Sequence, residues 1–433
     1  MDTHAEVMLW GKAIGAISWI DNRNIGVFQY TSEFAQSNIQ VSPIHMPLRD
    51  APYEFPQLGK DAFKGVPGML ADSLPDDFGN AVINAWLARQ GRSPESMNPV
   101  ERLCYIGNRG MGALEFEPSK HGDKDRQKEV DIEHLVELAA KVLNERQQLS
   151  GVLEGQDDQA VIEDILRVGT SAGGARAKAI ISWNPETGQF KSGQIPKDAG
   201  FEHWLIKFDG VKGSGDYGIS DPQGYGKLEY TYYQMAVEAG ITMSKCRLHE
   251  EGGRSHFMTR RFDRTDKGEK VHMQSLAALA HFNYKMPNSY SYEQCFQIMR
   301  KLELPMQQRE QQFKRSVFNV IARNQDDHVK NIAFLMDKEG RWSLAPAYDI
   351  TFAWNPSGVW TNSHQMSING KRDRFNLEDL LSLGKNAGIK PPKAKKMVRN
   401  IIDIVAGWEK KARNADMPDE MIKATKRGHR LTI

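Results

Sequence analysis

Asn324-Gln-Asp-Asp-His-Val-Lys-Asn-Ile332 is the most specific segment of this 433-residue chain. It comes directly after a stretch whose apolar spacing predicts a long helix, residues 307–324. Asp326 and Asn331 stand five residues apart, and a histidine and a lysine lie between them. A carboxylate, an amide oxygen and a cation on one loop are suited to orienting a hydroxyl group beside a phosphate. The segment therefore predicts a loop for phosphoryl transfer.

A second carboxylate, Asp349, follows this loop in the sequence Ala347-Tyr-Asp-Ile350. Two short apolar runs, 331–336 and 342–344, predict a strand hairpin that would bring Asp349 back beside Asn331. D-x-x-x-x-N is the spacing of a kinase catalytic loop, and Mg²⁺ prefers carboxylate and amide oxygens. We therefore expect Asn331 and Asp349 to hold a metal ion, although each Asp alone could instead cap a helix or a turn.

Two upstream segments supply cations. In Gly169-Thr-Ser-Ala-Gly-Gly-Ala-Arg-Ala-Lys178, the glycines would let the backbone approach a polyanion, although a plain hairpin turn is the alternative. Lys207 alternates with apolar residues in a predicted strand, and it needs an anionic partner if it is half-buried rather than facing solvent. Glu229 opens the next predicted helix, so it is a candidate ion-pair partner for Lys207, as in kinases.

The composition excludes several classes of protein. No apolar run approaches the ~20 residues of a membrane span, and the N-terminal residues lack the basic region of a signal peptide. The three cysteines lie far apart without CxxC spacing, which argues against a disulfide framework or a cysteine zinc site. With 40% hydrophobic and 26% charged residues, we expect a globular cytoplasmic protein without a membrane partner.

The predicted elements indicate an α+β fold with two lobes. Short β-like runs separated by glycine, proline and Asp/Asn breaks dominate the first half, and helical periodicity dominates the second. We predict three parts: a β-rich N-terminal subdomain (1–125), the remainder of the N-lobe with a phosphate loop and hinge (126–263), and an α-helical C-lobe with the catalytic loop and a basic C-terminal region (264–433).

The order of these motifs resembles that of the HipA family of serine/threonine protein kinase toxins of type II toxin–antitoxin systems. The resemblance rests on the S-x-G-G-A-x-x-K loop, I-K-F, R-F-D-R, D-x-H-x-K-N and Y-D-I, and it extends over nearly the whole chain. It implies a two-lobed protein-kinase-like fold with ATP and Mg²⁺ as cofactors. It also implies a DNA-binding antitoxin (a HipB-like helix-turn-helix dimer), operator DNA reached through that complex, and an aminoacyl-tRNA synthetase as the protein substrate.

The resemblance also implies a role for individual residues. Asp326 would be the catalytic carboxylate, with His328 and Lys330 beside the phosphates. Ser171 matches the position that family members autophosphorylate, which switches the kinase off. Arg260 to Phe262 would form the hinge against adenine, with Asp263 near the ribose. The full expected nucleotide-binding set is Gly173, Gly174, Ala175, Arg176, Ala177, Lys178, Lys207, Arg260, Arg261, Phe262, Asp263, His328, Val329, Lys330, Asn331, Tyr348 and Asp349.

Two positions depart from the family pattern. Arg260 stands where the best-known member has an acidic residue, so we expect an adenine contact there through the backbone. Asp327 replaces a glycine, and we expect the loop to tolerate it.

Two other functions fit the same motifs. A phosphotransferase acting on a lipid or a small molecule could use a D-x-H-x-x-N loop, although no basic amphipathic helix with an aromatic face supports the lipid version. A catalytically silent co-repressor scaffold is the other alternative. The retained Lys207, Asp326 and Asn331 argue against the loss of chemistry.

The formal net charge of +2 averages over unlike parts of the chain. Residues 370–433 hold ten Lys and six Arg against eight acidic residues, a net charge of +8, so the other 369 residues carry −6. Lys371, Arg372 and Arg374 are candidates for contact with a DNA backbone through an antitoxin complex. A solvated face is the alternative.

Overall fold

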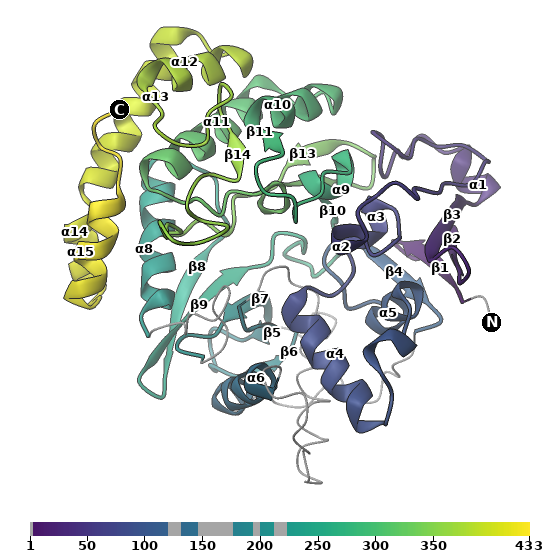
Figure 1. The fold of residues 1–433 in the computed structure, drawn as a ribbon. Coiled ribbons are helices and arrows are strands. Elements are labelled where there is room, and N and C mark those ends of the chain that lie inside the picture. The colour runs from purple at the N-terminus through teal and green to yellow at the C-terminus, as the bar shows by residue number, and fades with distance from the viewer. Residues whose placement is uncertain (1–2, 120–130, 146–175, 194–199, 212–222) are drawn as a thin grey trace. The chain divides into compact units, whose positions relative to one another are not determined.

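A computed structural model describes residues 3–119, 131–145, 176–193, 200–211 and 223–433 (Figure 1). The chain forms two compact units. Unit 1 comprises Met1–Gln40, Leu48–Gly226 and Cys246–Met273, and unit 2 comprises Val41–Pro47, Lys227–Lys245 and Gln274–Ile433. The last segment of unit 1 ends at Met273, ten residues beyond the boundary predicted from sequence, and the helix predicted to begin at Glu229 lies in unit 2.

The N-terminal part of unit 1 is built on an antiparallel sheet with the order β3-β2-β1-β4. Its strands are β1 (His4–Leu9), β2 (Lys12–Ile20), β3 (Ile25–Tyr30) and β4 (Leu114–Glu117). The chain between β3 and β4 forms the helices α1 (Ser32–Ala35), α2 (Lys60–Phe63), α3 (Gly68–Ala71), α4 (Asp77–Arg89), η1 (Pro94–Ser96) and α5 (Pro99–Ile106). Asp76 caps α4 by accepting a hydrogen bond from the Gly79 N–H.

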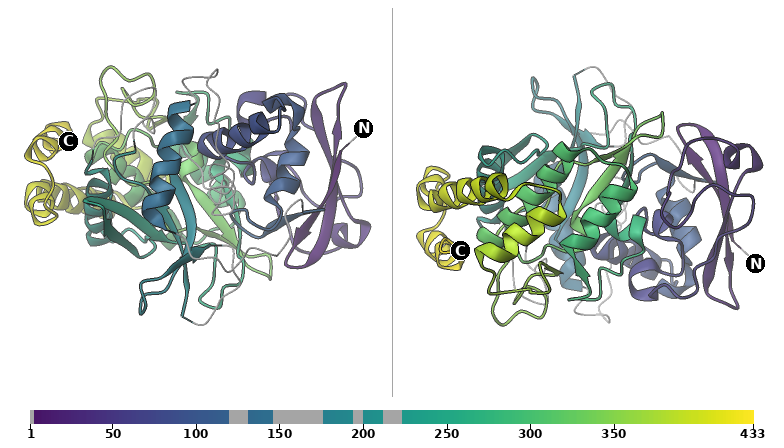
Figure 2. Two further views of the ribbon diagram at one scale, coloured as in Figure 1. Left: turned by 90° about the horizontal axis from the view of Figure 1, so that it is seen from below. Right: turned by 90° about the horizontal axis from the view of Figure 1, so that it is seen from above.

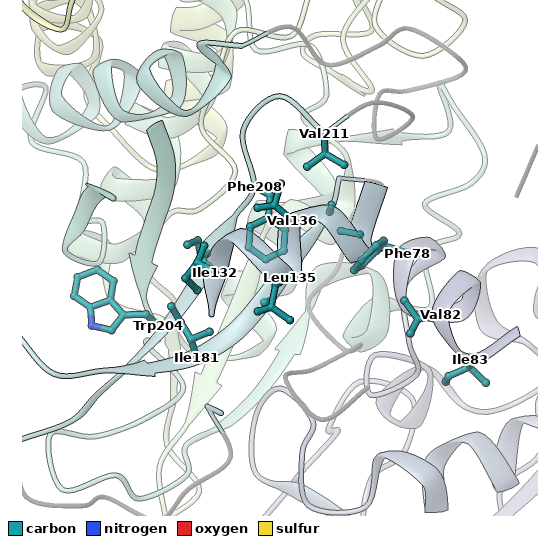
Figure 3. Packing of buried hydrophobic residues seen from close by; sticks show 14 of the residues in the cluster. Phe78, Val82, Ile83, Ile132, Leu135, Val136, Ile181, Trp204, Phe208 and Val211 are labelled. Atoms are coloured by element: carbon teal, nitrogen blue, oxygen red, sulfur yellow. The ribbon is translucent and has the colours of Figure 1, made fainter. Parts of the chain in front are cut away.

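A second antiparallel sheet of unit 1 has the order β6-β5-β7-β9-β8. Its strands are β5 (Lys178–Trp183), β6 (Phe190–Ser192), β7 (Glu202–Lys207), β8 (Cys246–Glu251) and β9 (Arg254–Arg260). Every residue of β5 is buried. Helix α6 (Ile132–Glu145) places Ile132, Leu135 and Val136 in the same apolar cluster as Ile181 and Phe208 (Figure 3), which is the main core of this sheet.

Unit 2 is mainly helical. Its helices are α8 (Tyr225–Glu238, of which Lys227 onward belongs to unit 2), α9 (Leu276–Ala280), α10 (Tyr292–Lys301), α11 (Met306–Ile321), η4 (Val329–Asn331), α12 (Leu377–Asn386), α13 (Pro391–Ala406), α14 (Trp408–Asn414) and α15 (Asp419–Gly428). Short strands accompany them: β10 (His272–Ser275, of which Gln274 onward belongs to unit 2), β11 (Tyr290–Ser291), β12 (Ala333–Met336), β13 (Trp342–Leu344) and β14 (Met366–Ser367). Helix α13 packs against α11 and α12 (Figure 2).

The β-rich unit 1 and the helical unit 2 confirm the predicted α+β fold. Within the helical second half, the apolar periodicity of residues 393–413 predicts one continuous helix, but the structure has two helices there, α13 and α14, that meet at Gly407. In the part of the chain that the structure describes, no helix is long and apolar enough to cross a membrane.

Candidate active site

The predicted catalytic loop begins where α11 ends. Arg323 adopts a left-handed backbone conformation (φ 63°), which turns the chain out of the helix. The loop then runs beside the segment that follows Asp349, because the Gln325 N–H donates to the Ala353 carbonyl (2.9 Å) and the Ala353 N–H to the Arg323 carbonyl (3.2 Å). These backbone bonds hold the start of the loop against the segment that follows Asp349.

Asp326 and Asn331 close this loop on itself. The side-chain Nδ2 of Asn331 donates to the backbone carbonyl of Asp326 at 2.8 Å. The backbone N–H of Asn331 donates to the His328 carbonyl at 2.9 Å. The Asp326 side chain is 41% exposed, and its Oδ1 lies 3.7 Å from His328 Nε2. Because the amide nitrogen of Asn331 is used inside the loop, its amide oxygen remains as the atom to bind a cation.

The strand hairpin predicted after the loop is confirmed. Strands β12 and β13 pair antiparallel, with Phe334 opposite Leu344. The chain returns to the loop, where the Tyr348 hydroxyl donates to the Lys330 carbonyl (2.6 Å) and Asn324 Nδ2 donates to the Asp349 carbonyl (3.2 Å). Asp349 has a left-handed backbone (φ 52°), a conformation that Asp tolerates better than most residues.

The electrostatics of His328 also place Asp349 close by. Burial lowers the pKa of His328 to about 4, and the nearby charge of Asp349 opposes that shift. The ring is therefore neutral near pH 7. Tyr284, which sequence reasoning missed, lies beside the loop, with its ring centroid 5.9 Å from that of His328 and 4.8 Å from Lys330 Nζ.

Asp327 is a structural residue of the loop, which goes beyond the expectation that the loop merely tolerates it. It is buried; its Oδ2 accepts from the Tyr292 hydroxyl (2.7 Å) and His364 Nδ1 (2.8 Å), and its Oδ1 accepts from the Gln365 N–H (2.8 Å). Burial alone would raise the pKa of Asp327, but His364 and these hydrogen bonds hold it below its usual range. The charged form is therefore favoured at this position.

In unit 1, the two candidate phosphate-binding lysines are cross-strand neighbours. Lys178 on β5 stands opposite Lys207 on β7. Lys178 is buried, and its Nζ lies 3.3 Å from Oδ2 of Asp76, the helix cap of α4 that sequence reasoning missed as a partner. Lys207 is half-buried, with Nζ 5.8 Å from the Phe257 ring centroid. Like charges directly opposite each other destabilise a sheet, so this placement favours anions nearby.

The rest of the predicted glycine-rich loop is described only in part. Ser171, Gly173, Gly174 and Ala175 lie outside the described residues. Ala177 is buried, and its carbonyl accepts from the Phe208 N–H. The Arg176 guanidinium lies 4.9 Å from the Tyr225 ring centroid.

One predicted hinge residue, Arg261, and the predicted ribose contact, Asp263, bind each other in the structure. Asp263 is fully buried and accepts from Arg261 (2.9 and 2.6 Å), from Arg264 (2.9 Å) and from the Gly112 N–H (2.7 Å). Although burial by itself favours the neutral acid, the two arginines hold the pKa of Asp263 well below its usual range. These contacts give Asp263 and Arg261 a structural role within unit 1. A ribose contact by Asp263 stays a prediction.

Arg260 precedes that buried pair, and Phe262 lies between its two members in the sequence. Arg260, at the end of β9, contacts Asp266 (2.8 Å) and Glu202 (3.7 Å) on a partly exposed surface. The Arg261 N–H donates to the His203 carbonyl at 2.9 Å, which continues the strand pairing. Glu229 is buried on α8 in unit 2, whereas Lys207 is in unit 1, and their ion pair stays a prediction.

The candidate DNA-contacting residues differ from one another in structure. Arg372 donates to the carbonyls of Gln365 (2.7 Å), Tyr290 (3.5 Å) and Asn288, which makes it a structural residue of its loop. Lys371 pairs with Asp379 at 2.8 Å. Arg374 is exposed. Lys371 is exposed as well, and a DNA contact by any of the three stays a prediction.

The ligands available for a metal ion are few. Among the residues that the structure describes, no group of three or more His, Cys, Asp or Glu side chains comes together as a metal site. The amide oxygen of Asn331 and the carboxylate of Asp349 suit Mg²⁺, which binds proteins through one or two such oxygens and fills its shell with water and phosphate oxygens. The donor set therefore fits a magnesium ion that arrives with a nucleotide.

Comparison with known families covers most of the chain. A model described as the HipA-like C-terminal domain matches residues 170–408, and one described as the HipA N-terminal domain matches residues 5–117. The putative kinase Y4mE of Sinorhizobium fredii is 23% identical over 188 residues, which are 40% of this chain and 43% of that protein. A putative kinase of Haemophilus influenzae is 26% identical over 160 residues, 33% of this chain and 47% of that protein. The matched parts thus cover less than half of each relative.

A solved structure matches over nearly the full length. It is a chain of the Shewanella oneidensis toxin–antitoxin complex of HipA, HipB and operator DNA. The TM-score is 0.66 at 16% identity, and the match covers 98% of this chain and 95% of that one. This likeness confirms the fold predicted from the order of motifs.

Proposed function

Because this chain belongs to the HipA family, we propose that it is an ATP-dependent serine/threonine kinase and the toxin of a toxin–antitoxin pair. The observation that carries the proposal is the closed catalytic loop. The bond from Asn331 Nδ2 to the Asp326 carbonyl leaves a half-exposed carboxylate and an amide oxygen on one short loop, and the hairpin returns Asp349 to it. That donor set suits phosphoryl transfer to a hydroxyl group.

Asp326 would accept the proton of the attacking hydroxyl. The hydroxyl oxygen bonds to the γ-phosphorus, the bond from that phosphorus to the bridging oxygen breaks, and ADP leaves. His328, neutral near pH 7, would donate a hydrogen bond to a phosphate oxygen, and Lys330 would offset phosphate charge. Mg²⁺, held by Asn331 and Asp349, would neutralise phosphate charge when bound.

The nucleotide phosphates would contact Lys207, with Lys178 and the glycine-rich loop beside them. The cross-strand placement of the two lysines supports this assignment. Adenine would contact the backbone of Arg260 and Phe262, since the Arg261 N–H already bonds to His203.

The family suggests the substrate and partners. We place the action of this chain in the cytoplasm, on an aminoacyl-tRNA synthetase, with autophosphorylation of Ser171 as the inactivating step. A HipB-like antitoxin would bind the chain and carry it to operator DNA, where exposed Arg374 could reach a backbone phosphate. The Shewanella relative, with its antitoxin and operator in one complex, supports this arrangement.

Incubation with γ-labelled ATP and Mg²⁺, followed by mass spectrometry, tests the proposal. Label on a serine or threonine of the chain or of an added aminoacyl-tRNA synthetase supports a protein kinase, and label on Ser171 supports the regulatory step. Label only on lipid or small molecules from an extract would favour the other phosphotransferase. If no label is transferred while the chain still binds its antitoxin on DNA, the silent scaffold is favoured.

A further inference from the structure

The last residues of the chain contact the catalytic loop. Arg430 follows α15, and its backbone N–H donates to the carbonyl of Ile321, the final residue of α11 (2.9 Å). Its side chain is only 9% exposed, and Nη1 lies 3.0 Å from His364 Nε2. The Nη2 atom of Arg430 pairs with Asp373. A residue near the C-terminus thus reaches the turn from which the catalytic loop begins.

The direction of the hydrogen bond between Arg430 and His364 follows from the chemistry of arginine. A guanidinium offers donors and no acceptor, so Nε2 of His364 must be the acceptor in its contact with Arg430. With Nε2 as the acceptor, the ring proton lies on Nδ1, which donates to Oδ2 of Asp327 at 2.8 Å. Arg430, His364 and Asp327 therefore form a continuous chain of oriented hydrogen bonds.

Arg430 also reaches the loop on the other side of Asp326. With the Gln325 amide oriented so that its nitrogen donates to the Thr361 carbonyl (2.9 Å), its oxygen accepts from Arg430 Nη2 at 3.1 Å. Gln325 and Asp327 are the two neighbours of Asp326, and both are buried. Arg430 thus holds the residues on each side of Asp326, one directly and one through His364.

A neighbouring contact reinforces the same turn. His429 Nε2 lies 2.9 Å from the Tyr232 hydroxyl, which donates to the carbonyl of Ala322 at 2.7 Å. The C-terminal segment therefore contacts the Ile321 carbonyl directly and the Ala322 carbonyl through Tyr232, at the point where α11 ends and the loop begins. Loss of these contacts would free the base of the loop.

We propose that Arg430 is a positioning residue, which acts through Gln325, His364 and Asp327 to hold the carboxylate of Asp326 in its reactive orientation. This inference rests on the proposed kinase function. Arg430 itself touches no reacting group. Its role is to limit the conformations of the loop, and outer contacts of this kind typically contribute roughly 10- to 100-fold to activity.

Steady-state kinetics separate this role from a general loss of folding. Arg430→Met is expected to lower kcat roughly 10- to 100-fold with the KM for ATP nearly unchanged, because the nucleotide contacts remain. The matched control is Arg427→Met, which removes an exposed arginine from the last turn of α15 and should leave both constants unchanged. The melting temperature of each variant is measured alongside. A kcat equal to that of the wild type would overturn the inference.

A double-mutant cycle tests the route through His364. His364→Asn keeps a donor near the Nδ1 position for Asp327 but lacks the acceptor for Arg430. If Arg430 acts through His364, adding Arg430→Met to His364→Asn should cost clearly less than it costs in the wild type. Losses that multiply would contradict the route.

The tautomer of His364 gives a readout that does not depend on phosphotransfer. Nitrogen NMR of the imidazole should show the proton on Nδ1 in the wild type, and a change in the ring signals in Arg430→Met. A proton on Nε2 would overturn the chain of bonds. If the wild type is inactive, the proposed function fails and the catalytic part of this inference fails with it. An active wild type beside a fully active Arg430→Met overturns the positioning role alone.

Discussion

The side-chain amide of Asn331 donates to the backbone carbonyl of Asp326 at 2.8 Å. This bond closes a loop of six residues and leaves the amide oxygen of Asn331 as an acceptor. In the proposed function, one side chain would therefore both shape the loop and bind Mg²⁺. Each role would use a different atom of the same amide.

Asn331→Ala should lower kcat and raise the Mg²⁺ concentration needed for half-maximal activity by roughly 10- to 100-fold, because a ligand and a loop contact are both lost. The measurement is a magnesium titration of phosphotransfer at saturating ATP. Asn400→Ala, an exposed asparagine on α13, is the control. A normal magnesium requirement in Asn331→Ala would contradict the assignment of this residue as a ligand.

Lys207→Met should raise the KM for ATP roughly 10- to 100-fold, because a hydrogen bond to a charged phosphate contributes about 1.5–3 kcal/mol. Lys191→Met, on β6 of the same sheet, serves as the comparison. Nucleotide affinity is measured by calorimetry, so the result does not depend on turnover. Equal affinities for the two variants would count against a phosphate contact by Lys207.

His328 should not produce a step in the pH–rate profile between pH 6 and 8. Burial lowers its pKa to about 4, so the ring stays neutral throughout that range. Since the folded pKa lies below the unfolded value of about 6.5, its contribution to stability is present above pH 6.5 and is lost as the pH falls towards 4. Profiles of the wild type and His328→Gln should have the same shape; a limb near 6.5 found only in the wild type would contradict this.

Asp263→Asn should destabilise unit 1 by about 3–5 kcal/mol, because it leaves Arg261 and Arg264 buried without their carboxylate. The wild-type pKa of Asp263 is held low, so its stabilisation is complete above the unfolded value of about 4 and is lost as the pH falls further. Urea unfolding at pH 7 measures the change. The exposed Asp266→Asn is the control, and equal unfolding free energies for the two variants would contradict the structural role of Asp263.

Local patterns predicted the elements that carry the site. The alternation of polar and apolar residues around Lys207 and the two apolar runs of the hairpin at 331–344 are local patterns. The structure has strands in both places. The motif spacing from Asp326 to Asn331 likewise specified a closed loop, because both groups lie within a few residues.

Contacts between distant residues could not be predicted in the same way. Asp327 meets His364 across 37 positions, and His364 meets Arg430 across 66, with no periodicity to signal either contact. The charge pattern also gave no signal that the Arg372 side chain donates to backbone carbonyls, because its acceptors lie outside the basic run. Gly407 was a visible signal, and it marks the junction of α13 and α14.

The most direct measurement of the central claim is single-turnover phosphotransfer from γ-labelled ATP by Asp326→Asn. The substitution keeps the backbone carbonyl that Asn331 contacts and removes the charge that would accept the proton. Asp403→Asn, an exposed carboxylate on α13, is the matched control. Asp326→Asn should lose transfer by at least roughly 100-fold with ATP affinity and melting temperature retained, while Asp403→Asn transfers normally. Transfer by Asp326→Asn at the wild-type rate would contradict the account.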